Sequence, residues 1–179
     1  MLQVESTGRI VILNGAPRSG KSSIARVIQE TFDGVWMNLG VDGFMRMYHA
    51  LYASIAAHSR AGLNVVVDVG HHDVYSVPRG ILPVCARQLA GLPVLVVGVC
   101  CPLEVIMERR RATWPCNYPE DGSIPEPVQR WQVAVHLPGI YDLEVDTSRL
   151  SAEECAELIR QRLESGPPGT ACHRLAAMS

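Results

Sequence analysis

The sequence predicts an α/β protein whose parallel sheet is covered by helices on both faces. Five apolar runs rich in Val, Ile and Leu have the length of strands, and most of them lack the polar alternation of a solvent-exposed face. Segments with apolar residues at helical spacing lie between these runs, which is typical of parallel strands joined by crossover helices. The expected strands span residues 9–14, 35–39, 63–68, 94–100 and 143–146.

The helices between these strands are indicated by periodicity and by capping signals. Pro102 suits the first turn of a helix, Gly62 ends another, and Ser151-Ala152-Glu153-Glu154 has the form of a capping box. The expected helices span residues 22–32, 44–60, 78–89, 102–111, 128–136 and 151–166. Residues 113–127 are rich in Pro, Asn, Asp and Gly and are expected to form a loop.

Length and charge restrict the class of protein further. A chain of 179 residues is long enough for one well-buried core, so we expect residues 1–166 to form a single domain and residues 167–179 to be a disordered tail. The net charge of −2 argues against a nucleic-acid partner and against an anionic membrane surface. No apolar run reaches the roughly 18 residues of a membrane helix, and residues 1–8 do not resemble a signal peptide. We therefore expect a cytoplasmic protein and leave its oligomeric state open.

The cysteines are expected to be buried, reduced thiols. None of them has the C-x-x-C or C-x-x-H spacing of a zinc site, and several lie in apolar stretches. The six are Cys85, Cys100, Cys101, Cys116, Cys155 and Cys172.

The strongest chemical signal is a phosphate-binding loop between the first strand and the first helix. Residues 15–22 match the pattern G-x-x-x-x-G-K-[ST] in full, with the strand before it and the helix after it that this pattern requires. Glycines let the backbone approach a phosphate, and the N–H groups and the dipole of the helix N-terminus attract negative charge. The residues expected to hold the nucleotide phosphates are Gly15, Ala16, Pro17, Arg18, Ser19, Gly20, Lys21, Ser22 and Ser23.

Composition supports a special role for Lys21. It is the only lysine among sixteen basic residues, and the other fifteen are arginines. A lysine is a compact point charge on a flexible stem, which an arginine cannot replace where a planar group does not fit. We expect the Lys21 ammonium to reach the β- and γ-phosphates of ATP and the Ser22 hydroxyl to bind Mg²⁺.

Acidic residues follow several of the expected strands at the edge where this loop lies. Asp68 ends an apolar run and is predicted to assist Mg²⁺ together with Ser22, whereas Asp42 lies on a more open, glycine-flanked turn and is predicted to be the base that accepts the proton of an attacking hydroxyl. The alternative for both is an ordinary turn or helix-cap role, which is common for Asp after a strand.

Several of these motifs together resemble a known family, the chloramphenicol phosphotransferases. The resemblance covers about residues 9–162. It rests on Ile12-Leu13-Asn14-Gly15, Ser19-Gly20-Lys21-Ser22, Gly40-Val41-Asp42, Val67-Asp68-Val69, Val135-His136 and Tyr141-Asp142-Leu143-Glu144-Val145-Asp146-Thr147-Ser148. It implies a three-layer α/β/α P-loop kinase fold of the shikimate-kinase type with a five-stranded parallel sheet. It also implies ATP with Mg²⁺, transfer of the γ-phosphate to a primary hydroxyl of an antibiotic, and Asp42 as the catalytic aspartate.

The sequence departs from that family at two places. The segment between Asp42 and Tyr48 is shorter than in relatives, where it helps to enclose the acceptor. The Arg-Gly-Asp-Arg lid sequence of relatives is replaced by Arg109-Arg110-Arg111 and the residues after it. Arg109 is the predicted catalytic arginine, and Arg130 is a candidate for a second charge. The alternative is a solvated basic helix end stabilised by the helix dipole.

Weaker signals concern the acceptor. The run His71-His72-Asp73 is predicted either to line the acceptor pocket or, more commonly for such residues, to lie in an exposed loop. His136 is interpreted as structural. The aromatic and methionine side chains that form either an apolar acceptor wall or ordinary core are Trp36, Phe44, Met45 and Trp114.

Three functions remain open from the sequence. The first is an ATP-dependent phosphotransferase that acts on a hydroxyl of a small molecule, such as an antibiotic. The second is a metabolite kinase of the shikimate, nucleoside or sugar-acid type with a different pocket. The third is a nucleotide-binding regulator without turnover, which the missing lid arginine would permit.

Overall fold

The structure, a computed structural model, describes residues 7–39, 48–71, 80–113 and 123–178. Within them lies a five-stranded sheet in the order β2-β3-β1-β4-β5, and every neighbouring pair of strands is parallel. The strands are β1 Ile10–Asn14, β2 Trp36–Asn38, β3 Asn64–Val69, β4 Val94–Cys100 and β5 Leu143–Asp146. The predicted α/β class and parallel sheet are confirmed.

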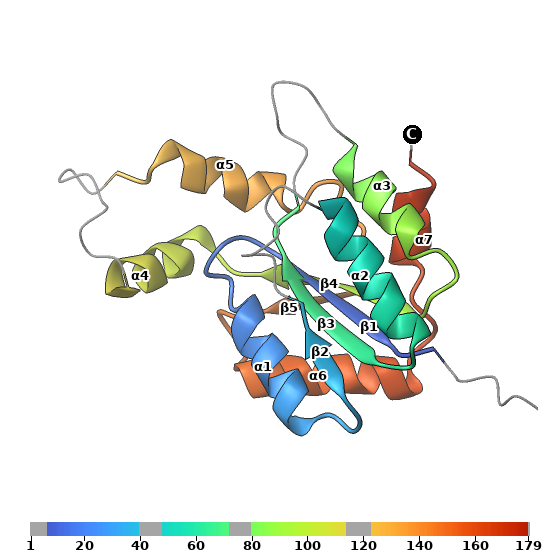
Figure 1. The fold of residues 1–179 in the computed structure, drawn as a ribbon. Coiled ribbons are helices and arrows are strands. Elements are labelled where there is room, and N and C mark those ends of the chain that lie inside the picture. Colours follow the sequence, from blue (N-terminus) through green and yellow to red (C-terminus); the bar gives the residue numbers. More distant parts are fainter. Residues whose placement is uncertain (1–6, 40–47, 72–79, 114–122, 179) are drawn as a thin grey trace, which may run out of the picture.

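Helices cover both faces of this sheet and make three layers (Figure 1). Helices α1 (Lys21–Thr31) and α6 (Ala152–Ser165) pack on one face. Helices α2 (Tyr48–Arg60), α3 (Ile81–Gln88) and α7 (Ala171–Ala176) pack on the other. Helices α4 (Leu103–Thr113) and α5 (Glu126–Ala134) extend away from the sheet on the side where the β1–α1 connection lies.

The two cores follow from the alternation of side chains along each strand. Ile10 and Ile12 of β1 pack in the core under α2, α3 and α7, whereas Val11 and Leu13 pack in the core under α1 and α6. All four are at most 5% exposed. A central parallel strand is therefore apolar throughout, because both of its faces are covered.

Most expected elements are present with small shifts at their ends. Helix α5 begins at Glu126, two positions earlier than expected, and α4 ends at Thr113. The capping box is confirmed: the Glu154 N–H donates to Ser151 Oγ (3.2 Å), and the Ser151 N–H donates to a carboxylate oxygen of Glu154 (2.7 Å).

The C-terminal tail differs from the prediction. We expected residues 167–179 to be disordered, but α7 forms there, and Ala171, Cys172 and Leu175 are buried against the sheet and α3. The carboxylate of Asp142 accepts hydrogen bonds from the N–H groups of Thr170 (2.7 Å) and Ala171 (2.9 Å). A helix of six residues has no stability of its own, so only these tertiary contacts explain it.

Four of the described cysteines are buried and Cys100 is half-buried, as free thiols. Cys116 lies outside the described residues. Among the described helices, none combines the length and the apolar character that crossing a membrane requires.

Candidate active site

The β1–α1 connection has the backbone shape of a phosphate-binding loop. A side chain at Gly15 would put its Cβ 2.3 Å from the carbonyl oxygen of Val99, so only glycine fits there. Arg18 (φ 69°) and Gly20 (φ 97°) both have left-handed conformations, which turn successive N–H groups toward one side. The N-cap residue of α1 is Gly20, and α1 has no side-chain cap hydrogen bond. The backbone N–H groups of the first turn can therefore bind an anion. The nine residues predicted to hold phosphates all lie in this loop and the first turn of α1.

The charged and hydroxyl groups of the loop meet a carboxylate of the neighbouring strand. The Lys21 ammonium lies over the loop and donates to the carbonyl oxygen of Ala16 (3.0 Å). The Ser22 hydroxyl donates to a carboxylate oxygen of Asp68 at the end of β3 (2.6 Å). The structure therefore brings Ser22 and Asp68 together, as the sequence predicted for a magnesium site.

This pair suits a magnesium ion in its chemistry. A hydroxyl and a carboxylate are the hard oxygen ligands that Mg²⁺ prefers, and Mg²⁺ in kinases takes most of its remaining ligands from water and from the phosphates. Ser22 is exposed and Asp68 is half-buried, so both are accessible from the side of the loop. Ser22 and Asp68 therefore have the ligand chemistry and the accessibility that a Mg²⁺ ion requires.

Arg109 does not lie apart on a lid but against the phosphate loop. Its guanidinium donates to the carbonyl oxygens of Thr147 (2.6 Å) and Arg18 (3.3 Å) and to the Thr147 hydroxyl (3.1 Å). That hydroxyl in turn donates to the carbonyl oxygen of Ser19 in the loop (2.6 Å). Thr147 is 9% exposed, and its methyl group lies next to Gly20. Thr147 and Arg109 thus form a clamp, here called the loop clamp, that joins the end of β5 and helix α4 to the phosphate loop.

Sequence reasoning missed the role of Thr147. The residue lies in the 141–148 motif that carries the family resemblance. Thr147 contacts a loop residue 128 positions earlier in the sequence. This contact depends on the strand order of the sheet, in which only β4 lies between β5 and β1. The motif was a usable signal, but its physical reason was not visible in the sequence.

Other predicted residues are placed as follows. Arg130 forms an exposed ion pair with Glu126 on its own helix (3.8 Å), an ordinary arrangement for a solvated helix face. Trp36 is 6% exposed and belongs to the core under α1 and α6, so the core interpretation is correct for it. Predicted residues that lie outside the described residues are Asp42, Phe44, Met45, His72, Asp73 and Trp114.

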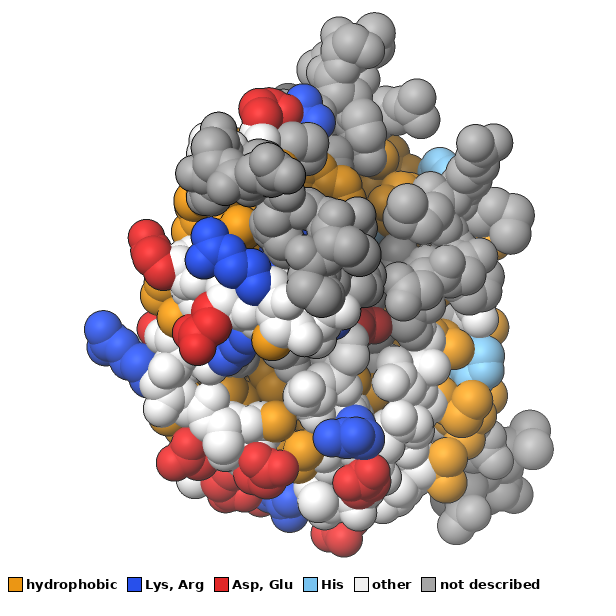
Figure 2. All heavy atoms as spheres, turned by 90° about the vertical axis from the view of Figure 1, so that its left-hand side faces the viewer, with side chains coloured by type: hydrophobic (Ala, Val, Ile, Leu, Met, Phe, Trp, Pro, Cys, Tyr) orange, Lys and Arg blue, Asp and Glu red, His pale blue; other side chains and the backbone are white. Residues whose placement is uncertain are grey.

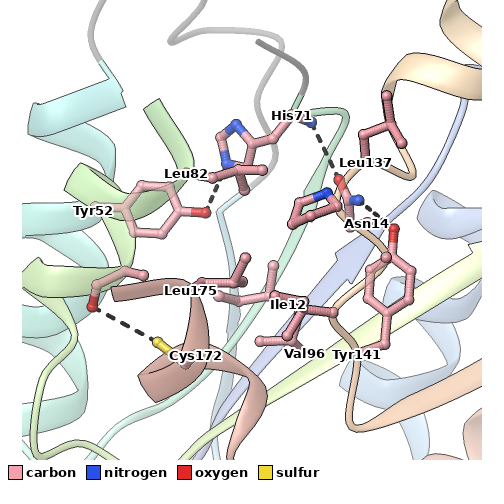
Figure 3. A pocket seen from close by; sticks show the side chains of 14 residues that line it. Ile12, Asn14, Tyr52, His71, Leu82, Val96, Leu137, Tyr141, Cys172 and Leu175 are labelled. Atoms are coloured by element: carbon pink, nitrogen blue, oxygen red, sulfur yellow. Dashed lines mark hydrogen bonds between the residues drawn. The ribbon is translucent and has the colours of Figure 1, made fainter. Parts of the chain in front are cut away.

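On the opposite face of the sheet, polar side chains from distant segments form a hydrogen-bonded chain (Figure 3). The Tyr52 hydroxyl and His71 Nε2 are 2.7 Å apart. The backbone N–H of His71 donates to the side-chain oxygen of Asn14 (3.2 Å), and the Asn14 side-chain amide donates to the Tyr141 hydroxyl (2.9 Å) and to the Val135 carbonyl oxygen (2.7 Å). His71 is 2% exposed, so its expected place in an exposed loop is wrong. The burial of its side chain against α2 decides this, and α2 is distant in sequence.

His136 extends this chain. Its Nδ1 lies 2.9 Å from the Tyr141 hydroxyl, so the histidine holds the turn that follows α5. Burial lowers the pKa of His136; Glu144 opposes this effect, and the charge of Lys21 adds to it.

Among the described residues, the face that carries α4 and α5 has charged side chains of both signs (Figure 2). In Figure 2, the visible acidic and basic side chains of the described residues are interspersed among hydrophobic and neutral ones. Attraction of a phosphate on this face would therefore depend on the local groups of the loop rather than on a broad charged patch.

Comparisons with known proteins agree with this geometry. A family model described as chloramphenicol phosphotransferase-like protein matches residues 8–49 and 43–164. The two matched stretches overlap at residues 43–49, just after Asp42. A sequence comparison with curated proteins finds no significant match.

Solved structures with similar folds are P-loop kinases and related proteins. The APS kinase of Mycobacterium tuberculosis in complex with AMPPNP and APS is 21% identical, with a TM-score of 0.63 over 89% of this chain and 99% of that one. The tunicamycin resistance protein of Deinococcus radiodurans is 17% identical (TM-score 0.60; 90% and 98% covered). The shikimate kinase of Acinetobacter baumannii in complex with shikimate is 12% identical (TM-score 0.56; 89% and 95% covered). At these identities the likeness shows the fold, and it confirms the predicted three-layer P-loop kinase fold.

Proposed function

The chain belongs to the chloramphenicol phosphotransferase-like family and is a phosphotransferase, and we propose that it uses ATP and Mg²⁺ to phosphorylate a hydroxyl group of a small molecule. One observation carries this proposal: the loop that holds Lys21 and Ser22 ends beside the carboxylate of Asp68, with a hydrogen bond of 2.6 Å. A phosphate loop, a lysine and a hydroxyl–carboxylate pair are the parts that position and neutralise a transferring phosphoryl group. We also propose that chloramphenicol is the acceptor and that the protein acts in the cytoplasm.

The backbone N–H groups of the loop bind the phosphates in this proposal, and Lys21 lies on the β- and γ-phosphates. Lys21 Nζ donates to the Ala16 carbonyl oxygen, and this hydrogen bond holds the ammonium over the loop. Such preorganised positive charge lowers the barrier because it needs little rearrangement when charge develops on the phosphoryl oxygens.

Ser22 and Asp68 are the residues that would hold Mg²⁺, which when bound neutralises charge on the β- and γ-phosphates. Asp42 is the proposed base, on the sequence evidence alone, and it accepts the proton of the acceptor hydroxyl as the oxygen attacks the γ-phosphorus. The bond between the γ-phosphorus and the bridging oxygen of ATP breaks, and ADP leaves.

Arg109 takes a positioning role in this proposal. Its donors bind the carbonyl oxygens of Arg18 and Thr147, so it keeps the loop in the shape that the phosphates require. This differs from the lid role that the sequence suggested.

Mass spectrometry tests the proposal directly. Chloramphenicol incubated with the protein, ATP and Mg²⁺ is expected to gain ~80 Da, the mass of the transferred phosphoryl group. The Asp42→Asn variant is expected to bind ATP but to transfer at a rate lower by about 10²-fold or more. Asp33→Asn, an exposed Asp in the turn after α1, is the matched control and should retain the activity.

Three results would change the proposal. Transfer to shikimate or to a nucleoside but not to chloramphenicol would favour a metabolite kinase, the second candidate. ATP binding without transfer to any acceptor would favour a nucleotide-binding regulator. Full activity of Asp42→Asn would exclude Asp42 as the base.

A further inference from the structure

A hollow lies at the edge of the sheet where the strands begin, opposite the edge that carries the phosphate loop. Trp36 and Asn64 are the first residues of β2 and β3, Arg9 directly precedes β1, and all three line the hollow. The rest of its lining comes from the residues just after α1 and from the second half of α6, two helices that pack side by side on one face of the sheet (Figure 1). The cavity volume is about 250 Å³. A cavity of about 150 Å³ already holds benzene, so a small organic molecule fits here.

This hollow is separate from the candidate active site. Helix α1 begins with Lys21 at the phosphate loop, and its C-terminal cap, Phe32, lines the hollow. With 11 residues and a rise of about 1.5 Å per residue, the helix spans about 16 Å. A small molecule in the hollow therefore does not contact the groups at the phosphate loop, and it is a ligand other than the nucleotide or the acceptor.

The lining carries as much positive as negative charge. Arg9 and Arg160 are positive, and Asp33 and Glu164 are negative. Within the part of the chain that the structure describes, no ion pair joins any two of these four residues, and Arg160 pairs instead with Glu157 on its own helix (3.3 Å). Opposite charges that face one hollow without pairing are complementary to a ligand that itself carries both signs.

Both arginines are positioned by contacts within the protein. Arg160 Nη2 donates to the carbonyl oxygen (3.3 Å) and the hydroxyl (3.2 Å) of Thr31, and its guanidinium carbon lies 4.6 Å from the centre of the Phe32 ring. The backbone N–H of Arg9 donates to the side-chain oxygen of Asn64 (2.8 Å), which fixes the backbone from which the Arg9 side chain extends. A guanidinium that is already held in this way loses little rotamer freedom when it binds a carboxylate.

The spacing of Arg160 and Glu164 suits two opposite charges on one carbon atom of a ligand. The two residues are four positions apart on α6, so they lie on the same face of the helix, with Cβ atoms about 6 Å apart. An α-amino acid carries its carboxylate and its ammonium on one carbon and can therefore contact both. Leu163 and Phe32, both half-buried, supply apolar surface in the same hollow.

We propose that this hollow binds a small zwitterion of the α-amino-acid type with an apolar side chain. Arg160 and Arg9 bind its carboxylate, and Glu164 binds its ammonium. Leu163 and Phe32 contact its apolar side chain. A ligand with only one charge displaces water from the arginines or from Glu164 without replacing it by a charged partner, so it binds more weakly. The assignment does not depend on the phosphotransfer reaction.

Calorimetric titration of the wild-type protein at neutral pH tests the need for both charges. Three probes share one aromatic body: L-phenylalanine has both charges, hydrocinnamate lacks the ammonium, and phenethylamine lacks the carboxylate. We expect L-phenylalanine to bind with a Kd below about 1 mM and each analogue to bind at least about tenfold more weakly. Absence of L-phenylalanine binding, or equal binding of either analogue, overturns the proposal.

A matched set of variants tests the location. Glu164→Gln and Arg9→Gln each replace an exposed charge of the lining by a neutral amide. Each is expected to weaken L-phenylalanine binding about fivefold or more. Glu153→Gln is the control, because Glu153 is an exposed carboxylate in the first turn of the same helix and does not line the hollow. Its affinity should stay within about twofold of the wild type. Equal affinities of Glu164→Gln and Glu153→Gln would mean that the ligand binds elsewhere, and the assignment of the hollow would be wrong.

Discussion

The two faces of the sheet end in sites of different construction. On the side of α1, the site is made by the backbone of one short loop, with left-handed residues at Arg18 and Gly20 and a required glycine at position 15. On the side of α2 and α7, the hydrogen-bonded chain of Figure 3 is made by side chains whose hydrogen bonds join residues as far apart as Asn14 and Tyr141. Under the proposed function, the backbone site holds the nucleotide phosphates, which P-loop kinases share. A side-chain site, in contrast, can change without disturbing the fold.

If this division is correct, variants on the loop side should change nucleotide use, and the largest effect is expected at Lys21. Lys21→Ala removes the charge that we propose lies on the β- and γ-phosphates, so we expect the rate of transfer to fall about 10²- to 10³-fold. Steady-state kinetics with varied ATP measure this. Arg26→Ala removes an exposed charge on the same helix and is the control, so its kinetics should be close to those of the wild type. A Lys21→Ala variant with normal kinetics would contradict the loop assignment.

Asp68→Asn is expected to have the next largest effect, which is a weaker affinity for Mg²⁺. Ser22 would keep its hydroxyl, but the carboxylate that it contacts would become a neutral amide. The Mg²⁺ concentration for half-maximal transfer should rise about 10- to 100-fold, while acceptor affinity at saturating Mg²⁺ stays unchanged. Asp33→Asn is again the control. An unchanged Mg²⁺ requirement would remove Asp68 from the metal site.

The loop clamp is expected to contribute a smaller effect. Thr147→Val keeps the shape of the side chain but leaves the carbonyl oxygen of Ser19 without its donor and Arg109 without one acceptor. We expect the KM for ATP to rise about threefold to tenfold. Thr147→Ser, which retains the hydroxyl, should keep the KM for ATP close to that of the wild type. If Val and Ser behave alike, the hydroxyl does not position the loop.

The smallest expected effect is a loss of stability in alkali, to which buried thiols on both faces of the sheet contribute. Burial raises the pKa of Cys85 on α3 to about 12, and that of Cys155 on α6 to about 11, from an ordinary value of 9.0. Between these values the unfolded chain binds fewer protons than the folded one. The free energy of unfolding is therefore unaffected by these thiols below about pH 9 and falls as the pH rises toward 11 or 12.

Urea unfolding at about pH 8 and about pH 10.5 measures this decline. Cys85→Ala and Cys155→Ala should each reduce the decline, because each removes one thiol whose pKa burial raises. The difference between the two pH values is compared, so that the direct cost of each substitution cancels. An unchanged decline in both variants would contradict this prediction.

The accuracy of the sequence-based predictions follows the same division. Strands of β-branched residues, the capping box at Ser151 and the loop of residues 15–22 were predictable because each depends on neighbours along the chain. The proximity of Ser22 and Asp68 was also predictable, since the carboxyl ends of parallel strands meet at one edge. Asp42 stays a prediction, because it lies outside the described residues.

The elements that were missed depend on contacts between distant segments. Helix α7 was expected to be disordered because six residues after two prolines show no helical signal, and its burial against α3 explains why it forms. His71 was expected more often in an exposed loop because that is the commoner place for such histidines, whereas its burial depends on Tyr52 of α2, which is distant in sequence. Thr147 belongs to the motif of residues 141–148, but the sequence did not show that it contacts the phosphate loop.

The sequence by itself determined the fold class, the order of strands and helices along the chain, and the chemistry of the phosphate loop, because period, capping and glycine geometry are local properties. Only the tertiary structure decided that Arg109 and Thr147 hold the loop. It alone also placed Arg9, Arg160 and Glu164 around one hollow and showed that the tail completes the helical layer. Those features depend on which surfaces pack together, and packing is decided by the shape and burial of side chains from segments that are far apart in sequence.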